Sequence, residues 1–477
     1  MRPKLLAGLG LGALLVLATA LLLVSRAERG SGYSTEWAGP DAATTRDAGD
    51  GYVTTGEPPK GLTPATDLSP EERRRNFEAL ARGIESSYAM FEIKHLDWPQ
   101  VVARYRPRVA EPMSTEEYYE LLWSLVNELQ DTHSWIQGRQ NPYLRFGPRL
   151  VVEPFGPRVY VTFVPPGSAA AQAGVQVGWE VAGVDGLSLP QQVAQVRPRL
   201  KALSSDHAGQ RQAYRAVLRG DRGTTCAVTF RLPHGELRRA TLQRDDASPG
   251  RAPWRCPGEV SRGRFVAHGR LASGLGYIRI ASFSGRQEIS QEFSTALEQL
   301  RGTRGLVLDV RGNEGGFGNA QPEIVGHFLT QETPVAISYS KQPGAGNALT
   351  RHDAKFRPTG PWQYTKPVAL LVDQDTGSAA DLFVCYLRAA PHVTTVGSPT
   401  HGNLSGVGAY VVLPCYLVVR VSNGYVCDAQ GAPIEGRGNV PDIRVEPTIE
   451  DLLAGRDPVL DRAEALLLQR TSAEASG

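Results

Sequence analysis

Ser378 lies where an apolar run ends and a helical pattern begins, in "LLVDQDTGSAADLFVCYL", residues 370–387. A serine at such a junction is usually only the N-cap of a helix. Its hydroxyl can also act as a nucleophile, provided that a nearby base takes its proton. The surrounding "TGSAA" is not the Gly-x-Ser-x-Gly elbow of the α/β-hydrolases, so these residues alone do not decide between the two roles.

A second loop, "DVRGNEGG" at 309–316, also follows a strand-like apolar run. Its glycines let backbone N–H groups approach a bound group closely, as an oxyanion hole requires. Such a loop can instead cradle a phosphate, but no Gly-Lys-Ser/Thr follows it. The two loops together therefore favour a nucleophile beside an oxyanion hole over phosphate binding.

Both loops belong to a pattern of alternating strands and helices that begins near residue 276. "GYIRIASF", "GLVLDV", "PVALLVD" and "VTTVGS" are short apolar runs, and segments of helical periodicity lie between them. Continuous apolar strands separated by helices predict a buried, largely parallel sheet and therefore an α/β fold. Sites in such sheets form at the carboxyl ends of the strands, where Ser378 and the glycine loop both fall.

Residues 68–138 show the pattern of a small helical domain. "SPEE" at 69–72 and "STEE" at 114–117 each place a serine three residues before a glutamate, which predicts capping boxes at two helix starts. The second helical pattern ends at "LQDTHSW", residues 129–135. His133 therefore lies at the end of this domain.

Residues 146–242 resemble a PDZ domain, because strand-like runs lead to "PGSAA", "AGVQVGW" and "VAGVDG" at the spacing of that family. The resemblance implies a groove that binds a peptide by strand addition, with a loop whose amides hold a terminal carboxylate. By analogy that loop consists of Phe146, Gly147, Pro148 and Arg149. A PDZ-shaped spacer with a closed groove is the alternative.

Taken together, the helical domain, the PDZ-like region, "GYIRIASF", "DVRGNEGG", "TGSAAD" and "VGSPTHGNLSG" resemble the S41 peptidases, the C-terminal processing and tricorn-type proteases. The resemblance covers nearly all of residues 68–447. It implies a crotonase-like (ClpP/crotonase) catalytic core at 265–450 with an inserted PDZ-like domain, followed by a C-terminal helical tail at 451–477.

The same resemblance assigns the catalytic groups. Ser378 is the nucleophile, and the N–H of Ala379 forms the oxyanion hole with the N–H of Gly315 or Gly316. The lysine base of the processing branch has no counterpart, because Asn403 holds its place in "THGNLSG" and asparagine cannot take a proton. Since nothing requires this side chain to carry a proton, we expect Asn403 to contribute little to catalysis.

The histidine base and glutamate of the tricorn-type branch both have counterparts. "DTHSW" supplies His133, and "IEGRGNVPDI" supplies Glu435. In such a triad the neutral imidazole takes the serine proton, and the carboxylate fixes the imidazole tautomer. His401 is the alternative base, because it lies beside Asn403 in the sequence. Structural roles, as turn, loop or helix-start partners, are expected for Asp131, Asp309 and Asp381.

The resemblance implies a serine endopeptidase that cleaves a peptide or unfolded protein through an acyl-enzyme, without metal or cofactor. A non-catalytic peptide- or lipid-binding protein on the same scaffold is the alternative. No Cys/His cluster has metal-ligand spacing. The 51 basic and 49 acidic residues are spread without long runs of one sign, which argues against nucleic-acid binding.

The N-terminus carries a targeting signal. Arg2 and Lys4 precede an uncharged apolar run, residues 5–24, that is long enough to span a bilayer. Residues 1–26 are therefore predicted to be a signal anchor, with a cleaved signal peptide as the alternative. Residues 27–67 are polar and rich in Gly, Ser, Thr and Pro, which predicts a flexible linker to an extracytoplasmic remainder.

Five cysteines allow two disulfides in an exported protein. Cys415 and Cys427 flank a segment with an Asn-Gly hairpin signal, so they are predicted to pair across two strands. Cys226 and Cys256 are the second predicted pair, and Cys385 is predicted to be a buried free thiol.

Overall fold

The computed structural model describes residues 45–46, 51–55, 59–139, 146–247, 252, 254, 257–285, 287–342, 346–406 and 408–474. The chain divides into two compact units, Met1–Ala38 and Gly39–Gly477, and every described residue belongs to the second. The predicted signal anchor, residues 1–26, and most of the predicted linker lie outside the described residues. In the part of the chain that is described, no helix is long and apolar enough to cross a membrane.

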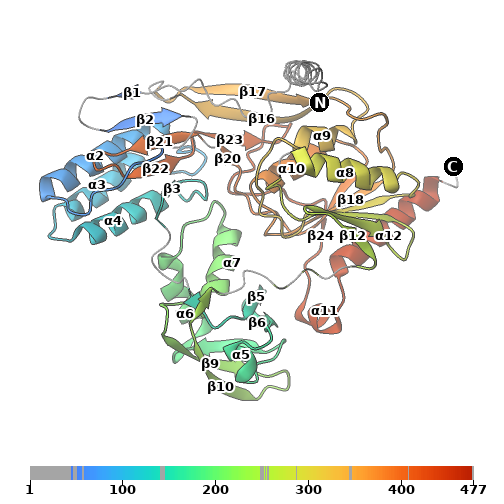
Figure 1. The fold of residues 1–477 in the computed structure, drawn as a ribbon, viewed down its shortest axis with the longest axis horizontal. Coiled ribbons are helices and arrows are strands. Elements are labelled where there is room, and N and C mark those ends of the chain that lie inside the picture. The colour runs from blue at the N-terminus through green and yellow to red at the C-terminus, as the bar shows by residue number, and fades with distance from the viewer. Residues whose placement is uncertain are drawn as a thin grey trace, which may run out of the picture. The chain divides into compact units, whose positions relative to one another are not determined.

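Three helices pack against one face of a five-stranded sheet (Figure 1). The helices are α2 (Pro70–Ser87), α3 (Trp98–Val109) and α4 (Thr115–Asn127). The sheet has the order β1-β2-β21-β22-β3, with the bounds Thr45–Arg46, Tyr52–Thr55, Ala409–Val412, Val418–Val421 and Trp135–Ile136. Both predicted capping boxes are confirmed, at Ser69 and at Ser114. The helices therefore share their apolar core with strands that come from far along the chain.

A seven-stranded sheet is formed by strands that lie between residues 260 and 444. Its order is β12-β13-β14-β15-β18-β19-β24, with the bounds Val260–Arg262, Val266–Arg270, Gly276–Ile280, Leu306–Asp309, Val368–Val372, Val393–Gly397 and Ile443–Arg444. In this sheet the neighbouring strands β14, β15, β18, β19 and β24 are parallel, whereas β12 and β13 pair antiparallel at one edge. The α/β class predicted from alternating strands and helices is confirmed.

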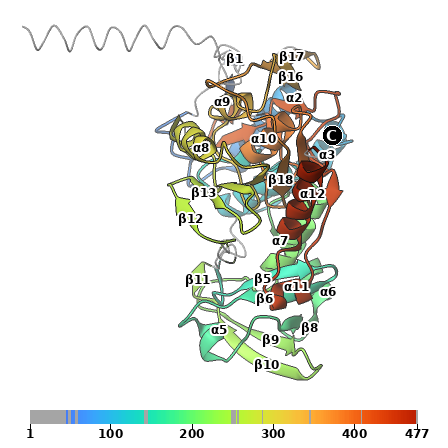
Figure 2. The same ribbon diagram turned by 90° about the vertical axis from the view of Figure 1, so that its right-hand side faces the viewer.

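Alternate residues of the parallel strands face two different helix layers. Leu370 of β18 packs in the apolar cluster of α8, α9 and α10, whereas its neighbour Leu371 packs with residues of α12. Figure 2 shows α8 and α12 on opposite sides of β18. This burial on both faces is the reason that the strands are apolar throughout rather than alternating. The helices are α8 (Gln287–Gln299), α9 (Gln321–Gly326), α10 (Ala379–Leu387), α11 (Ile449–Ala454) and α12 (Pro458–Glu474).

A third sheet has the order β17-β16-β23-β20, with the bounds Leu349–Phe356, Thr333–Lys341, Gly424–Cys427 and Ser405–Gly406. The hairpin predicted at Asn423 is wrong. The strand before it, β22, pairs in the five-stranded sheet, whereas the strand after it, β23, pairs with β16. Because the chain changes sheets at this point, its Asn-Gly signal does not join two paired strands.

The predicted disulfides are corrected accordingly. Cys415 and Cys427 are both buried free thiols. Cys226 is also free and buried within strand β9, and Cys256 lies outside the described residues. Cys385 is a buried free thiol, as predicted.

Residues 146–247, which we call the central domain, have an apolar core of their own. The main sheet has the order β10-β9-β7-β6-β5, with β8 paired to β7. Its strands span Val151–Phe155 (β5), Arg158–Phe163 (β6), Glu180–Val184 (β7), Leu187–Ser188 (β8), Thr225–Arg231 (β9) and Leu237–Gln243 (β10). Its helices are α5 (Ala169–Gln172), α6 (Leu189–Val196), the 3₁₀ turn η1 (Arg197–Arg199) and α7 (Asp206–Ala216), and α7 packs beside the edge strand β5.

Part of the loop predicted to hold a peptide carboxylate, residues 146–149, makes other contacts in the structure. Phe146 and Gly147 form the short strand β4, which pairs with β11 (Asp246–Ala247). The N–H of Phe146 donates to the carbonyl oxygen of Gly220 at 3.2 Å. Arg149 adopts a positive φ of 52°. In this structure the amide of Phe146 is therefore not available to a peptide carboxylate.

Candidate active site

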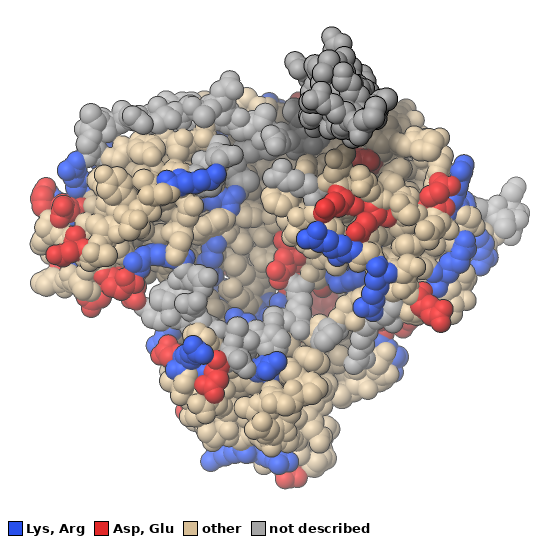
Figure 3. All heavy atoms as spheres, in the orientation of Figure 1, with Lys and Arg blue, Asp and Glu red and all other residues tan. Residues whose placement is uncertain are grey.

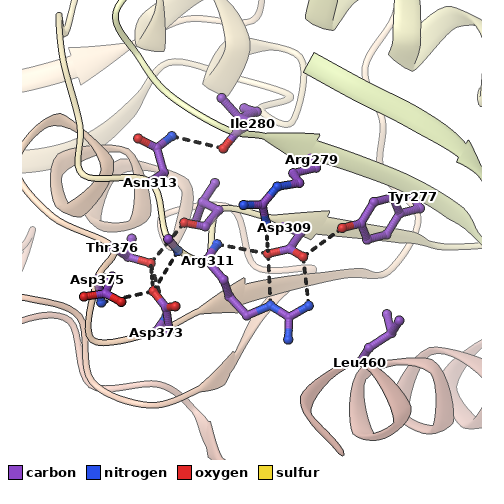
Figure 4. Close-up of polar contacts among 12 residues, drawn as sticks. Tyr277, Arg279, Ile280, Asp309, Arg311, Asn313, Asp373, Asp375, Thr376 and Leu460 are labelled. Carbon is purple, nitrogen blue, oxygen red and sulfur yellow. Dashed lines mark hydrogen bonds and ion pairs between the residues drawn. The ribbon is translucent and has the colours of Figure 1, made fainter. Parts of the chain in front are cut away.

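Two loops at the carboxyl ends of the neighbouring strands β15 and β18 are tied together (Figure 4). The N–H of Gly312 donates to Asp373 Oδ1 at 2.9 Å, and the N–H of Gly377 donates to the carbonyl oxygen of Asn313 at 3.0 Å. The Asn313 amide also donates to the carbonyl oxygen of Ile280 at 3.1 Å. The glycine loop and the serine loop are therefore held as one frame.

Asp309, the last residue of β15, anchors the start of the glycine loop (Figure 4). Its buried carboxylate accepts hydrogen bonds from Arg311 at 2.9 Å and from the Tyr277 hydroxyl at 2.8 Å, and Arg279 lies 3.5 Å away. Burial alone raises the pKa of Asp309, but the guanidinium charges and hydrogen bonds hold it below its ordinary value. Arg311 also pairs with Asp457 at 2.8 Å, which joins the loop to the segment before α12.

Ser378 has an unusual backbone conformation, with φ 53° and ψ −120°. Residues other than glycine rarely adopt such a φ, and the strain costs roughly 1–3 kcal/mol, so neighbouring groups must hold it. The N–H of Ser378 donates to Asn403 Oδ1 at 2.6 Å. Asn403 is held in turn, because its own N–H donates to Asp381 Oδ2 at 3.3 Å. The sequence predicted little contribution of Asn403 to catalysis; the contact with Ser378 shows a structural role for this side chain that the prediction did not consider.

The structure separates the two glycines that were candidates for the oxyanion hole. The N–H of Gly315 donates to Asn313 Oδ1 at 2.9 Å, so this N–H is already used. No hydrogen bond of the described residues uses the N–H of Gly316 or that of Ala379, the first residue of α10. A Cβ added to Gly315 would lie 2.9 Å from Ser378 Cβ, which shows how closely the glycine loop meets the serine. Gly316 and Ala379 therefore remain as the two available donors.

His133 lies in the turn after α4, with Nε2 3.1 Å from Ser378 Oγ. Its own N–H donates to Asp131 Oδ1 at 2.9 Å, which holds the turn. Burial lowers the pKa of His133 to about 4; the Asp131 charge opposes this shift, whereas Arg420 and Lys201 add to it. The imidazole is therefore neutral at pH 7 and can accept the serine proton.

The other ring nitrogen of His133 faces a serine rather than the expected glutamate. Nδ1 lies 3.0 Å from Ser405 Oγ, and Ser405 Oγ donates to Asp131 Oδ1 at 2.8 Å. Ser405 and Asp131 are both buried. A continuous chain of contacts thus runs from Ser378 through His133 and Ser405 to Asp131.

Glu435 makes a different contact from the one predicted. Its buried carboxylate pairs with Lys94, at 2.7 Å between Oε1 and Nζ. Lys94 Nζ also donates to the carbonyl oxygens of Gln130 at 2.9 Å and Ser204 at 2.8 Å. Burial raises the pKa of Glu435 to about 7, although Lys94 opposes this shift. No hydrogen bond of the described residues joins Glu435 to His133, because Lys94 takes the carboxylate.

His401, the alternative base, is held through its backbone. Its N–H donates to the carbonyl oxygen of Thr376 at 2.8 Å, and its carbonyl oxygen accepts a hydrogen bond from Ser205 Oγ. Its Nδ1 is buried without a partner in the described part of the chain. None of the hydrogen bonds found there joins the His401 ring to Ser378, so the geometry favours His133 as the base.

The central domain contacts the segments that carry Ser378 and His133. Arg215 of α7 binds the Asp375 carboxylate through two hydrogen bonds of 2.7 Å, in the loop that leads to Ser378. Thr132, the neighbour of His133, exchanges two hydrogen bonds of 3.1 Å with Ser204. The central domain therefore helps to hold both the serine loop and the histidine turn.

Sequence reasoning did not assign roles at the site to Asn403, Ser405 or Asp131. One local signal was available for the first two, because residues two apart in an extended segment point to the same side. Asp131 was expected to be a turn partner; it is one, and it also binds Ser405. The contact of Arg215 with the serine loop has no signal in the sequence, since it joins two domains.

The groups that converge on Ser378 are a neutral imidazole and backbone N–H donors, a set suited to acyl transfer. In the described part of the chain, no group of three or more His, Cys, Asp and Glu side chains could hold a metal ion. On the face shown in Figure 3, basic and acidic side chains are interspersed rather than gathered by sign.

Comparison with known proteins gives two domain matches. Residues 274–445 match peptidase family S41, and residues 69–127 match the tricorn protease C1 domain. Tricorn protease homolog 1 of Streptomyces coelicolor is 23% identical over 420 residues, which cover 83% of this chain and 35% of that protein. The carboxy-terminal processing protease CtpB of Bacillus subtilis is 31% identical over 130 residues, 27% of this chain and 25% of that protein. The chain thus spans about a third or less of the length of these curated relatives.

The fold is also similar to a solved structure, that of mature CPAF complexed with lactacystin. The TM-score is 0.69 at 16% sequence identity, and the match covers 85% of this chain and 99% of that one. At this identity the likeness concerns the fold alone. By the two domain matches, this chain carries a peptidase family S41 domain at residues 274–445, preceded by a tricorn protease C1 domain at residues 69–127.

Proposed function

We propose that this protein is a serine endopeptidase that hydrolyses peptide bonds through an acyl-enzyme formed on Ser378. The observation that carries the proposal is the 3.1 Å contact between His133 Nε2 and Ser378 Oγ. A base within hydrogen-bond reach is what a serine hydroxyl needs in order to act as a nucleophile. The match of residues 274–445 to peptidase family S41 supports the same reaction.

In the acylation step, Ser378 Oγ attacks the carbonyl carbon of the scissile bond while His133 Nε2 takes the hydroxyl proton. The carbonyl oxygen becomes an oxyanion, which the N–H groups of Gly316 and Ala379 stabilise. The imidazolium then gives its proton to the leaving amine as the C–N bond breaks. In deacylation, a water molecule gives a proton to the same nitrogen and attacks the ester carbon; as the bond from this carbon to Ser378 Oγ breaks, the imidazolium returns the proton to Oγ and the acid product leaves.

The test is labelling by a fluorophosphonate, which reacts with activated serines. Wild-type protein should be labelled, Ser378→Ala should not, and His133→Ala should be labelled more slowly by several orders of magnitude. His327→Ala is the matched control, because His327 is also buried and its Nε2 lies 2.9 Å from a serine hydroxyl, that of Ser294. Absence of labelling in a folded wild-type sample would instead favour the non-catalytic binding protein.

We also propose a crotonase-like S41 core and a PDZ-like domain at residues 146–242, with a groove between β5 and α7. The edge position of β5 supports this, because an edge strand can accept an added peptide strand. Glu153 of β5 and Arg215 of α7 form an ion pair of 2.7 Å between the two walls. A peptide that enters this groove must therefore displace or share that pair.

The proposed location is extracytoplasmic, with residues 1–26 as a membrane anchor. The basic flank and the apolar run of residues 5–24 support this. The native protein should stay in the membrane fraction after a high-salt wash, and deletion of residues 1–30 should release it. A mature N-terminus near Glu28 would show a cleaved signal peptide instead.

A further inference from the structure

We propose that Ser405 and Asp131 are the positioning residues of the base, and that they set the tautomer and orientation of His133. The family resemblance assigns this role to Glu435. The inference rests on the proposed function only in taking His133 as the base and Ser378 as the nucleophile.

The direction of the hydrogen bonds follows from the chemistry of the three groups. An ionised carboxylate only accepts hydrogen bonds, so the single hydroxyl proton of Ser405 must point toward Asp131 Oδ1, 2.8 Å away. The Ser405 oxygen can then only accept from His133 Nδ1, at 3.0 Å. Nδ1 therefore carries the imidazole proton, and Nε2 presents its lone pair to Ser378 Oγ.

The surroundings of Asp131 favour the ionised form of its carboxylate. It is buried, yet its carboxylate accepts hydrogen bonds from the N–H of His133, from Ser405 Oγ and from Ser134 Oγ. Burial by itself raises the pKa of Asp131, but the charge of His133 in its protonated form and the hydrogen bonds from Ser134 and from the His133 N–H hold this pKa below its ordinary value. Ser134 is fixed in turn by the N–H of Ser422, which donates to its oxygen at 3.1 Å.

One short extended segment holds both catalytic groups. Asn403 and Ser405 are two residues apart, and Leu404 between them is buried in an apolar cluster. Asn403 accepts the N–H of Ser378 at 2.6 Å, and Ser405 meets His133. The same three-residue segment thus contacts both the nucleophile and the base.

Glu435 does not compete for Nδ1 in this arrangement. Its carboxylate is paired with Lys94 at 2.7 Å, and Lys94 is tied by two further bonds to the carbonyl oxygens of Gln130 and Ser204. Three contacts of one ammonium group hold this pair in place. Glu435 therefore contributes to the setting of the site through Lys94 rather than through the imidazole.

The first experiment measures peptide hydrolysis by Ser405→Ala, which removes the acceptor of the Nδ1 proton. We expect kcat to fall at least about tenfold, and at most about 10⁴-fold as for a triad histidine in the wrong tautomer, with KM unchanged. Ser405→Thr keeps the hydroxyl and should restore most of kcat. Ser405→Cys keeps the size but is a weak acceptor, and it serves if the alanine variant does not fold.

The matched control is Ser340→Ala. Ser340 is also buried, and its Oγ lies 3.0 Å from a histidine ring nitrogen, His352 Nε2, outside the site. It should lose similar stability without the loss of kcat. An equal loss of kcat in Ser340→Ala and Ser405→Ala would show that the loss in Ser405→Ala comes from general destabilisation, and it would overturn the inference.

The second experiment reads the tautomer directly, by ¹⁵N NMR of histidine-labelled protein at neutral pH. The His133 signals are assigned by their absence in His133→Gln. We expect a proton on Nδ1 in the wild type, a mixture of tautomers in Ser405→Ala, and the wild-type pattern in Glu435→Gln. A wild-type pattern in Ser405→Ala, or a changed one in Glu435→Gln, would return the role to Glu435 and overturn the inference.

The tautomer measurement does not require turnover, so the two proposals can fail separately. If Nδ1 is protonated as expected and depends on Ser405, but the fluorophosphonate does not label Ser378, the positioning inference stands and the peptidase proposal fails. If Ser378 is labelled while the proton lies on Nε2, the positioning inference fails alone.

Discussion

Replacing Asn403 by alanine tests the frame that holds the nucleophile. The Asn403 oxygen accepts the N–H of Ser378 at 2.6 Å, and Ser378 is held at a φ of 53°. Without this acceptor, the N–H of Ser378 loses its hydrogen-bond partner, which costs about 1–3 kcal/mol. This cost is similar to the strain energy of the Ser378 backbone. If the serine relaxes away from the attack geometry, the barrier to acylation rises by the same amount. The rate of acylation should then fall about 5- to 150-fold.

The assay is the second-order rate of fluorophosphonate labelling, measured together with the midpoint of thermal unfolding. Asn76→Ala is the matched control, because Asn76 is also buried and its Oδ1 accepts a backbone N–H from a distant segment, that of Cys415, at 2.9 Å. Both variants should lose stability, but only Asn403→Ala should lose labelling rate. Wild-type labelling in a folded Asn403→Ala protein would refute the view that this side chain holds Ser378.

Three further predictions concern titration, a buried ion pair and the thiols. Because burial lowers the pKa of His133 to about 4, kcat/KM for an uncharged peptide should stay level down to about pH 5 and fall near pH 4, where the imidazole gains a proton. An acid limb of the pH profile centred between about pH 6 and 7, which shifts when His133 is substituted, would contradict this. Since the folded-state pKa of Glu435 is raised from 4.5 to about 7, its contribution to stability is full below pH 4.5 and is lost as pH rises through 7. Lys94→Met removes the paired cation, so it should lower the free energy of unfolding in urea by up to about 3–5 kcal/mol at pH 8 and by clearly less at pH 5. An equal loss at both pH values would count against this pairing. In a Cys256→Ser variant, a thiol reagent should label no cysteine of the native protein, and after unfolding without reductant it should label Cys226, Cys385, Cys415 and Cys427.

Features that depend on neighbours along the chain were predicted well. The capping boxes at Ser69 and Ser114 join residues three apart, so nothing distant can move them. The parallel sheet was predicted from apolar runs separated by helices, because burial on both faces leaves that pattern in each strand. The same local reasoning failed at Asn423, because the strands on either side of the Asn-Gly pair find partners in two different sheets.

The sequence by itself determined which residues could do the chemistry, since the motifs around Ser378 and His133 name a nucleophile and a base. Only the tertiary structure decided which acceptor meets the second nitrogen of that base. Ser405 lies 272 positions from His133, and two buried carboxylates, Asp131 and Glu435, were available nearby. The choice depends on where the cations lie: Lys94 takes Glu435, and Asp131 is left to orient the imidazole through Ser405. No local pattern encodes that outcome, because it results from competition among charged groups that folding brings together.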